Sequence, residues 1–144
     1  MKRIVRSALV GCGAPEFYAL VEEIEAYPRF LPWCAAAEVR ERKPGVTVAT
    51  LTLAAKGLRH SFTTANSNDP GRGIDMRLVE GPFRHFQAQW RFTPLSEQAC
   101  KAEFTLEYEF SSGIVAGLLE PVFARLADKT LDAFRLRAEA GARA

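Results

Sequence analysis

Residues 101–110 read KAEFTLEYEF, a stretch in which polar and apolar side chains alternate without a break. A strict period of two predicts an antiparallel strand that buries one face and exposes the other. The preceding stretch 85–92, HFQAQWRF, alternates in the same way, with apolar side chains at Phe86, Ala88, Trp90 and Phe92. The buried face of the predicted sheet therefore carries large aromatic side chains.

Turn residues divide the chain before residue 85 into further strands. Five are predicted, over 2–10, 37–43, 46–55, 58–68 and 73–80. Pro44-Gly45, Lys56-Gly57 and Asn68-Asp69-Pro70-Gly71 supply the residue types that tight turns need. Together with 85–92 and 101–110, these segments predict a sheet of about seven strands.

Helical spacing replaces this alternation near both ends of the chain. From residue 113 to about 140, apolar residues recur in a row that contains Val122, Leu126, Thr130 and Phe134. Pro121 is expected to kink this helix or to begin its long part, which would leave 113–120 as a separate turn or two. An amphipathic helix is predicted over 15–26, followed by a short helical turn within 27–34.

This order of elements predicts an α+β fold, in which a curved antiparallel sheet wraps around a long C-terminal helix. The 144 residues fit a single domain, 1–144, and their composition is that of an ordinary globular chain. No apolar run approaches the roughly 18 residues of a membrane span. The apolar stretch 7–10 is too short for a signal peptide, so a cytoplasmic location is expected.

Residues that commonly carry catalysis are few and scattered. Cys12, Cys34 and Cys100 show no CxxC spacing, and His60 and His85 are the two histidines, so neither a disulfide framework nor a zinc site is predicted. Cys34 is a candidate nucleophile, but it lacks a nearby partner in the sequence. We therefore assign no catalytic or metal-ligating residue, and we expect no enzymatic activity and no required cofactor.

The aromatic side chains of the buried face predict a site for a hydrophobic ligand. Its expected lining is Phe62, Met76, Phe86, Trp90, Phe104 and Tyr108 from the strands, and Leu119, Val122, Phe123 and Leu126 from the helix. Phe30 and Trp33 are expected at the mouth of this site, either as a gate or as a plug that closes the core. The alternative is that the same side chains close-pack into a solid core, which the sequence does not separate from a hollow one.

The charge of the chain permits several partners without requiring one. The formal net charge is +2 and the pI is about 8.5. Basic residues cluster at Arg40, Arg42 and Lys43 and again at Arg125 and Lys129. Acidic residues are interleaved with them, so we expect no DNA binding and at most peripheral membrane contact. Docking to a large RNA–protein particle stays open.

The stretch 27–34, YPRFLPWC, resembles the signature of the bacterial ribosome-association toxin family. That family is related to mitochondrial coenzyme Q-binding proteins, and both belong to the polyketide cyclase/START-like superfamily. The similarity covers nearly the whole chain and continues at Gly81-Pro82-Phe83, Trp90-Arg91-Phe92, Cys100, Tyr108-Glu109-Phe110, Pro121-Val122-Phe123 and Ala133-Phe134.

The resemblance implies the helix-grip fold, with a hydrophobic tunnel between the sheet and the C-terminal helix. It also implies two functions. We expect as the main one the non-catalytic binding of ubiquinone or a related polyprenyl lipid, in support of respiration. The alternative is binding to the large ribosomal subunit, through Arg40, Arg42, Lys43, Arg125 and Lys129, which blocks subunit joining. A polyketide cyclase or aromatase activity is a distant third, since it rests on the fold alone.

Overall fold

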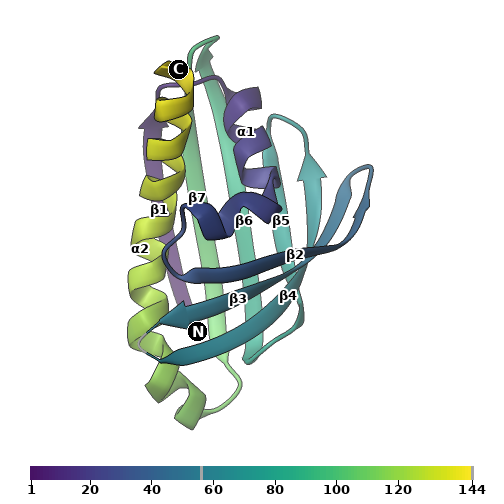
Figure 1. The fold of residues 1–144 in the computed structure, drawn as a ribbon, viewed down its shortest axis with the longest axis vertical. Coiled ribbons are helices and arrows are strands. Elements are labelled where there is room, and N and C mark those ends of the chain that lie inside the picture. Colours follow the sequence, from purple (N-terminus) through teal and green to yellow (C-terminus); the bar gives the residue numbers. More distant parts are fainter. Residues whose placement is uncertain (56, 144) are drawn as a thin grey trace.

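Strands dominate the computed structural model, which describes residues 1–55 and 57–143 (Figure 1). These residues form a seven-stranded antiparallel sheet in the order β1-β7-β6-β5-β4-β3-β2. The strands are β1 (Lys2–Val10), β2 (Cys34–Lys43), β3 (Val46–Ala55), β4 (Leu58–Asp69), β5 (Gly73–Glu80), β6 (Phe83–Ser96) and β7 (Ala99–Phe110). The first and last strands are therefore neighbours, and the predicted sheet of about seven strands is confirmed.

Three helical segments complete the chain: α1 (Ala14–Glu22), the 3₁₀ helix η1 (Ile24–Arg29) and α2 (Gly113–Arg143). Figure 1 shows α2 lying along the β1 side of the sheet, while β2, β3 and β4 curl round toward it. Phe123, Leu131 and Phe134 of α2 are buried in the core. The predicted arrangement, a curved sheet wrapped around a long C-terminal helix, is confirmed.

The alternation that predicted the last strands is preserved in the structure. Even-numbered residues of β7 from Cys100 to Phe110 are buried, and the odd-numbered ones are partly exposed. In β6 the register shifts between Phe83 and His85, so that Phe83 and Phe86 both face the core. The β2–β3 hairpin turns at Gly45, whose φ of 80° is the conformation that favours glycine. The predicted Lys56-Gly57 turn includes a residue outside those described.

The prediction of one helix over 15–26 is wrong. Helix α1 ends at Glu22, because Glu23 leaves the helical region with φ −79° and ψ 68°. The Val21 carbonyl then accepts a hydrogen bond from the Tyr27 hydroxyl. Pro28, which has no N–H to donate, lies inside η1. A side chain from the second segment thus caps the end of the first helix, and η1 begins before residue 27.

The prediction that 113–120 forms a separate segment is also wrong. Helix α2 continues through Pro121 and reaches Arg143. Proline removes the hydrogen bond to the carbonyl four residues earlier, which belongs to Gly117. Both Gly117 and Pro121 are exposed, so water can hydrate the carbonyl that the proline leaves without a donor. No helix in the described part of the chain is long and apolar enough to cross a membrane.

Candidate functional site

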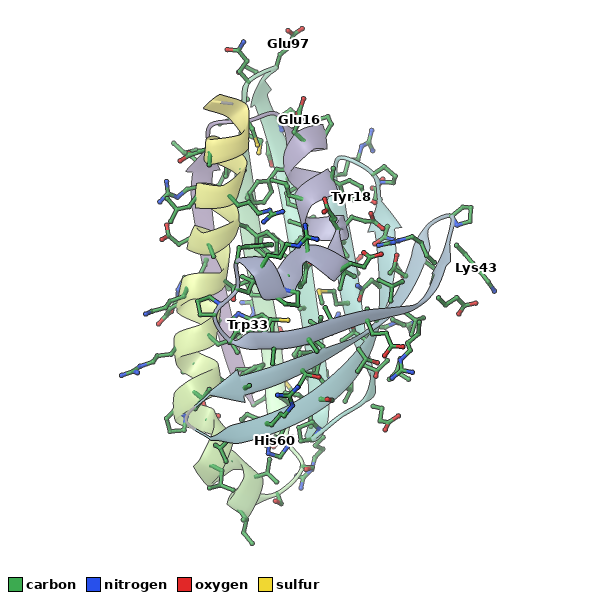
Figure 2. The ribbon with its side chains drawn as sticks, in the orientation of Figure 1. Glu16, Tyr18, Trp33, Lys43, His60 and Glu97 are labelled. Carbon is green, nitrogen blue, oxygen red and sulfur yellow. The ribbon has the colours of Figure 1, made fainter. Side chains whose placement is uncertain are left out.

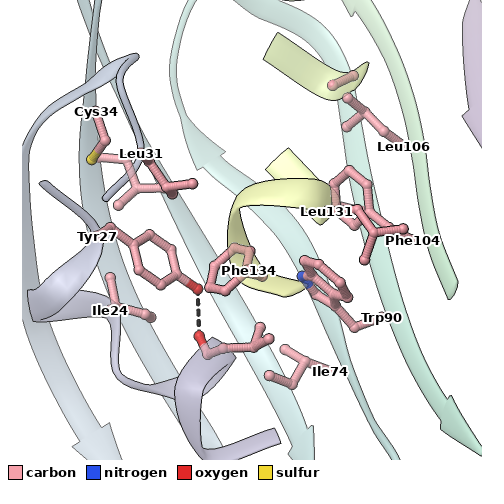
Figure 3. Close-up of a cluster of buried hydrophobic side chains, with 14 of the residues drawn as sticks. Ile24, Tyr27, Leu31, Cys34, Ile74, Trp90, Phe104, Leu106, Leu131 and Phe134 are labelled. Atoms are coloured by element: carbon pink, nitrogen blue, oxygen red, sulfur yellow. Dashed lines mark hydrogen bonds between the residues drawn. The ribbon is translucent and has the colours of Figure 1, made fainter. Parts of the chain in front are cut away.

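Aromatic side chains fill most of the space between the sheet and α2. Trp90 lies at the centre of one cluster, with ring centroids 4.7 Å from Phe104 and 5.4 Å from Phe134 (Figure 3). Phe123 anchors a second cluster, 4.6 Å from Tyr108 and 5.4 Å from Phe83. The Trp90–Phe134 and Tyr108–Phe123 contacts are edge-to-face, and aromatic contacts of this kind add to the stabilisation that burial provides. Much of the predicted ligand site is therefore a packed core.

A cavity remains where the two clusters meet. Its volume, taken as the space open to the centre of a water molecule, is about 60 Å³. Eight of the predicted lining residues border it: Trp33, Phe62, Met76, Phe86, Trp90, Phe104, Phe123 and Leu126. One water needs roughly 10–15 Å³ on this measure, and ligand pockets commonly measure roughly 300–1,000 Å³. The cavity thus accommodates small apolar groups but no polyprenyl tail.

Sequence reasoning missed half of the cavity wall. The additional lining residues are Tyr27, Leu31, Leu51, Ala88, Leu106, Ala127, Thr130 and Phe134. Two features of the sequence pointed to some of these additional residues. Tyr27 and Leu31 belong to the 27–34 stretch, and Thr130 and Phe134 continue the helical row of Leu126. Ala88 and Leu106 share strand faces with predicted residues, and Leu51 pairs with Phe62 across β3 and β4. All three are smaller than the aromatics that dominated the prediction.

The structure places four predicted lining residues elsewhere. Phe30 packs 5.0 Å from the Phe134 ring, with the Arg137 guanidinium 4.5 Å above its own ring. Tyr108 donates a 2.9 Å hydrogen bond to Glu120, and burial raises the pKa of its hydroxyl. Leu119 is buried outside the cavity wall, and Val122 borders a neighbouring surface groove.

Polar groups in the cavity wall are already hydrogen-bonded within the protein. The Trp33 indole nitrogen donates to the Thr130 hydroxyl at 3.2 Å, and that hydroxyl donates to the Leu126 carbonyl at 2.7 Å. The Tyr27 hydroxyl donates to the Val21 carbonyl. A ligand in the cavity therefore meets an apolar surface.

A surface groove lies on the other side of Trp33. It is lined by Pro32, Trp33, Ala54, Val122, Arg125, Leu126 and Lys129 and has a volume of about 250 Å³. Trp33 and Leu126 border both the groove and the cavity, so these two half-buried side chains form the wall between them. The Trp33 carbonyl accepts a 2.9 Å hydrogen bond from the Ala54 amide, which fixes the wall to β3. Figure 2 shows Trp33 beside α2.

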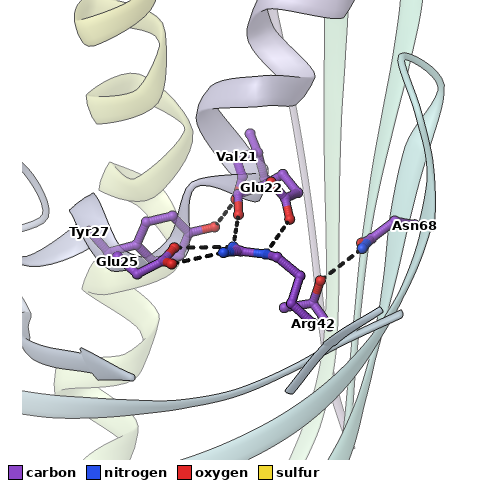
Figure 4. A network of polar contacts seen from close by, with 7 residues as sticks. Val21, Glu22, Glu25, Tyr27, Arg42 and Asn68 are labelled. Carbon is purple, nitrogen blue, oxygen red and sulfur yellow. Dashed lines mark hydrogen bonds and ion pairs between the residues drawn. The ribbon is translucent and has the colours of Figure 1, made fainter. Parts of the chain in front are cut away.

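The basic residues of β2 are neutralised by neighbouring carboxylates. Arg42 makes ion pairs of 3.0 Å with Glu22 and 2.8 Å with Glu25 (Figure 4), and the hydrogen bond to Arg42 lowers the pKa of Glu25. Lys43 pairs with Glu41 at 2.7 Å, and Arg40 pairs with Glu38 at 3.5 Å. Lys43 lies at the hairpin tip, on the side of the molecule away from α2 (Figure 2). The two predicted basic groups are thus separate.

Arg125 and Lys129 of α2 differ from the β2 residues, because the acidic residues next to them on the helix pair with other arginines. Asp128 accepts a 3.0 Å hydrogen bond from Arg6 of β1, and Asp132 accepts one of 2.6 Å from Arg135. Among the described residues, no carboxylate lies within 4 Å of the Arg125 or Lys129 nitrogens. Both side chains are exposed at the rim of the groove, which is therefore cationic.

Cys34, the candidate nucleophile, is buried beside this region. Burial raises the pKa of its thiol to about 11, and the sulfur donates a 3.4 Å hydrogen bond to the Ala36 carbonyl. The thiolate is the reactive form, and it is scarce at neutral pH when the pKa is this high. The thiol therefore behaves as a small core residue.

Comparison with known proteins identifies relatives along most of the chain. Residues 11–135 match the polyketide cyclase/dehydrase and lipid transport family. Over 139 residues the chain is 40% identical to the ribosome association toxin RatA of Vibrio cholerae, which covers 96% of both chains. A mitochondrial coenzyme Q-binding protein homologue of Xenopus laevis is 27% identical over 136 residues, which are 92% of this chain and 56% of that protein.

Solved structures of similar fold confirm the predicted START-like architecture. The Zhui aromatase/cyclase of a Streptomyces species matches 99% of this chain and 96% of its own, with a TM-score of 0.87 at 21% identity. A START superfamily protein of Mycobacterium smegmatis matches 96% of this chain and 97% of its own, with a TM-score of 0.80 at 18% identity. At these identities the likeness shows the fold alone. With the match over residues 11–135 and the 40% identical relative, the chain belongs to the polyketide cyclase/dehydrase and lipid transport family.

Proposed function

We propose that this protein associates with the ribosome, and that the large subunit, which the family resemblance implies, is its partner. The proposal reverses the order expected from the sequence, in which quinone binding came first. Two findings support the reversal. The 40% identical relative carries the name ribosome association toxin, and the internal cavity of about 60 Å³ is too small for a polyprenyl tail.

The observation that carries the proposal is a row of basic residues on α2. Arg125 and Lys129 lie one helical turn apart and share an exposed face, and Arg137, half-buried over the Phe30 ring, lies about two turns further along the helix. We call them the α2 basic row. None of the three has a carboxylate within 4 Å among the described residues.

This row has the chemistry that ribosomal RNA recognises. Phosphates bind exposed arginine and lysine side chains, and the released counterions supply much of the affinity. Cations that already hold a protein carboxylate gain less, because the existing ion pair must be broken first. The β2 cluster of Arg40, Arg42 and Lys43 is therefore left out of the proposed docking surface. The function requires no catalysis and no cofactor, and it places the protein in the cytoplasm.

Ribosome profiles after overproduction test this proposal. Wild-type protein is expected to shift ribosomes from joined particles to free subunits. Arg125→Glu/Lys129→Glu is expected to lose the shift, whereas Arg77→Glu, which reverses an exposed cation on β5, is expected to keep it. If overproduction of neither the wild type nor any variant changes the ribosome profile, the proposal is contradicted.

A second function is favoured by one observation, the apolar wall of the cavity. We propose that the interior also takes up the apolar part of a small molecule, of which an isoprenoid quinone is one candidate. The groove must open onto the cavity for any chain longer than a few carbon atoms. Mass spectrometry of an organic extract from gently purified protein, before and after quinone is offered, tests this function. An empty extract and no uptake contradict it.

A further inference from the structure

We propose that the groove and the cavity are two halves of one binding site, whose ligand is an amphiphile with an anionic head group and a single apolar chain. The chain passes Trp33 into the cavity, and the head group stays at Arg125 and Lys129 on the rim. This inference rests on the second proposed function and goes beyond it, since it assigns the route of access and the charge of the ligand.

The polarity of the cavity dictates the orientation of the ligand. The Tyr27 hydroxyl, the Trp33 indole nitrogen and the Thr130 hydroxyl all have hydrogen-bond partners within the protein. A head group placed in the cavity would lose its hydrogen bonds to water and find none of these donors free. The end of the apolar chain therefore occupies the cavity, and the rest of the chain and the head group remain in the groove.

The charge of the groove selects the head group. Arg125 and Lys129 lie one helical turn apart, line the same groove, and have no carboxylate within 4 Å among the described residues. A carboxylate or phosphate between them accepts charge-assisted hydrogen bonds. The neutral carbonyls of a quinone gain less from the same cations.

The proposed opening between the two halves involves a single side chain, that of Trp33. Trp33 and Leu126 are half-buried, and the Trp33 indole is held to α2 by the single hydrogen bond to Thr130. A change of the Trp33 rotamer breaks that bond and joins the groove of about 250 Å³ to the cavity of about 60 Å³. The joined volume reaches the lower end of the range of known ligand pockets, roughly 300–1,000 Å³.

Three ligands of equal chain length test the inference: decanoate, decyl phosphate and decan-1-ol. Each is titrated into ¹⁵N-labelled protein, and the dissociation constant and the shift of the Trp33 indole N–H resonance are measured. We expect at least one of the two anions to bind about tenfold more tightly than the alcohol, because two exposed cations contribute of the order of one factor of ten. Binding of one anion and not the other assigns the head group as carboxylate or phosphate.

Variants separate the inference from the function on which it rests. Arg125→Gln/Lys129→Gln is expected to lower anion affinity about tenfold and leave the alcohol unchanged, and Arg77→Gln to change neither. If alcohol and anions bind equally, interior binding stands and the anionic head group is overturned. Anions that bind without shifting the Trp33 resonance overturn the joined site. If no ligand binds, both this inference and the interior-binding function fail.

Discussion

Trp33 and Thr130 lie 97 positions apart in the sequence, and a hydrogen bond of 3.2 Å from the indole nitrogen to the threonine hydroxyl joins them. The backbone of Trp33 is bonded at the same time to Ala54 of β3. One residue therefore connects the segment before β2, the curled part of the sheet and helix α2. Because it also borders both the groove and the cavity, its position decides whether the two are separate.

Removal of the Thr130 hydroxyl is expected to loosen this connection. Thr130→Val keeps the shape of the side chain but offers no acceptor to Trp33. The expected loss in the free energy of unfolding is about 1 kcal/mol, the usual contribution of one hydrogen bond. Urea denaturation measures this loss in the free energy of unfolding. Faster hydrogen exchange of the Trp33 indole N–H would show that the loss arises at this hydrogen bond. Thr105→Val, on β7, serves as the control, and equal effects of the two variants would contradict the role of the bond.

Two alanine positions distinguish a void from a packed core. Ala88 borders the cavity, whereas Ala102 is fully buried outside its wall. Ala88→Val places its added methyl groups in empty space, so stability should hold or rise by about 1 kcal/mol. Ala102→Val overpacks the core and should cost about 1–3 kcal/mol. Equal losses in urea denaturation would mean that no usable space lies beside Ala88.

The buried thiols are expected to make stability fall in alkaline solution. Burial raises the pKa of Cys34 to about 11 and that of Cys100 to about 11, from an ordinary value of 9.0. A folded-state pKa above the unfolded one gives stability that is complete below pH 9 and is lost as the pH rises toward 11. The free energy of unfolding measured across this window should show the decline, and Cys34→Ala/Cys100→Ala should make it shallower. An equally steep decline in the double variant would assign the effect to other groups.

Arg42 is expected to act on stability and not on ribosome association. Its ion pairs with Glu22 and Glu25 are partly exposed, so Arg42→Gln should cost no more than about 1 kcal/mol. Because Arg42 lowers the pKa of Glu25, this contribution is present above the ordinary carboxyl pKa of 4.5 and is lost as the pH falls through the folded-state value. The free energies of unfolding of the wild type and of Arg42→Gln, measured at pH 7 and at pH 3, test this pH dependence. A loss that persists undiminished at pH 3 contradicts the assignment.

The sheet was predictable because its signal is local. Alternation in β7 sets which side chains face the core, and Pro44-Gly45 sets the β2–β3 hairpin. The end of α1 was not predictable from the same reasoning. Glu23 leaves the helical region there, and the Tyr27 hydroxyl caps the Val21 carbonyl, a contact that helical periodicity does not reveal.

The site was less predictable than the fold, because pairing and volume are properties of three-dimensional packing. Sequence charge alone makes Arg42 and Arg125 look alike. In the structure Arg42 meets Glu22 and Glu25 from another element, while the carboxylate near Arg125, Asp128, is bound by Arg6 of β1. The aromatic positions were identified, but their rings fill most of the space that the pattern suggested as a tunnel.

The most direct test of ribosome association is co-sedimentation of the purified protein with purified ribosomal subunits over a series of salt concentrations. Wild-type protein and Arg42→Gln should sediment with the large subunit, with affinity that falls as salt rises. Arg125→Glu/Lys129→Glu should bind about tenfold or more weakly, with a shallower dependence on salt because phosphate contacts are lost. Undiminished binding of that double variant would contradict the α2 docking surface, and absence of wild-type protein from both subunit pellets would contradict ribosome association itself.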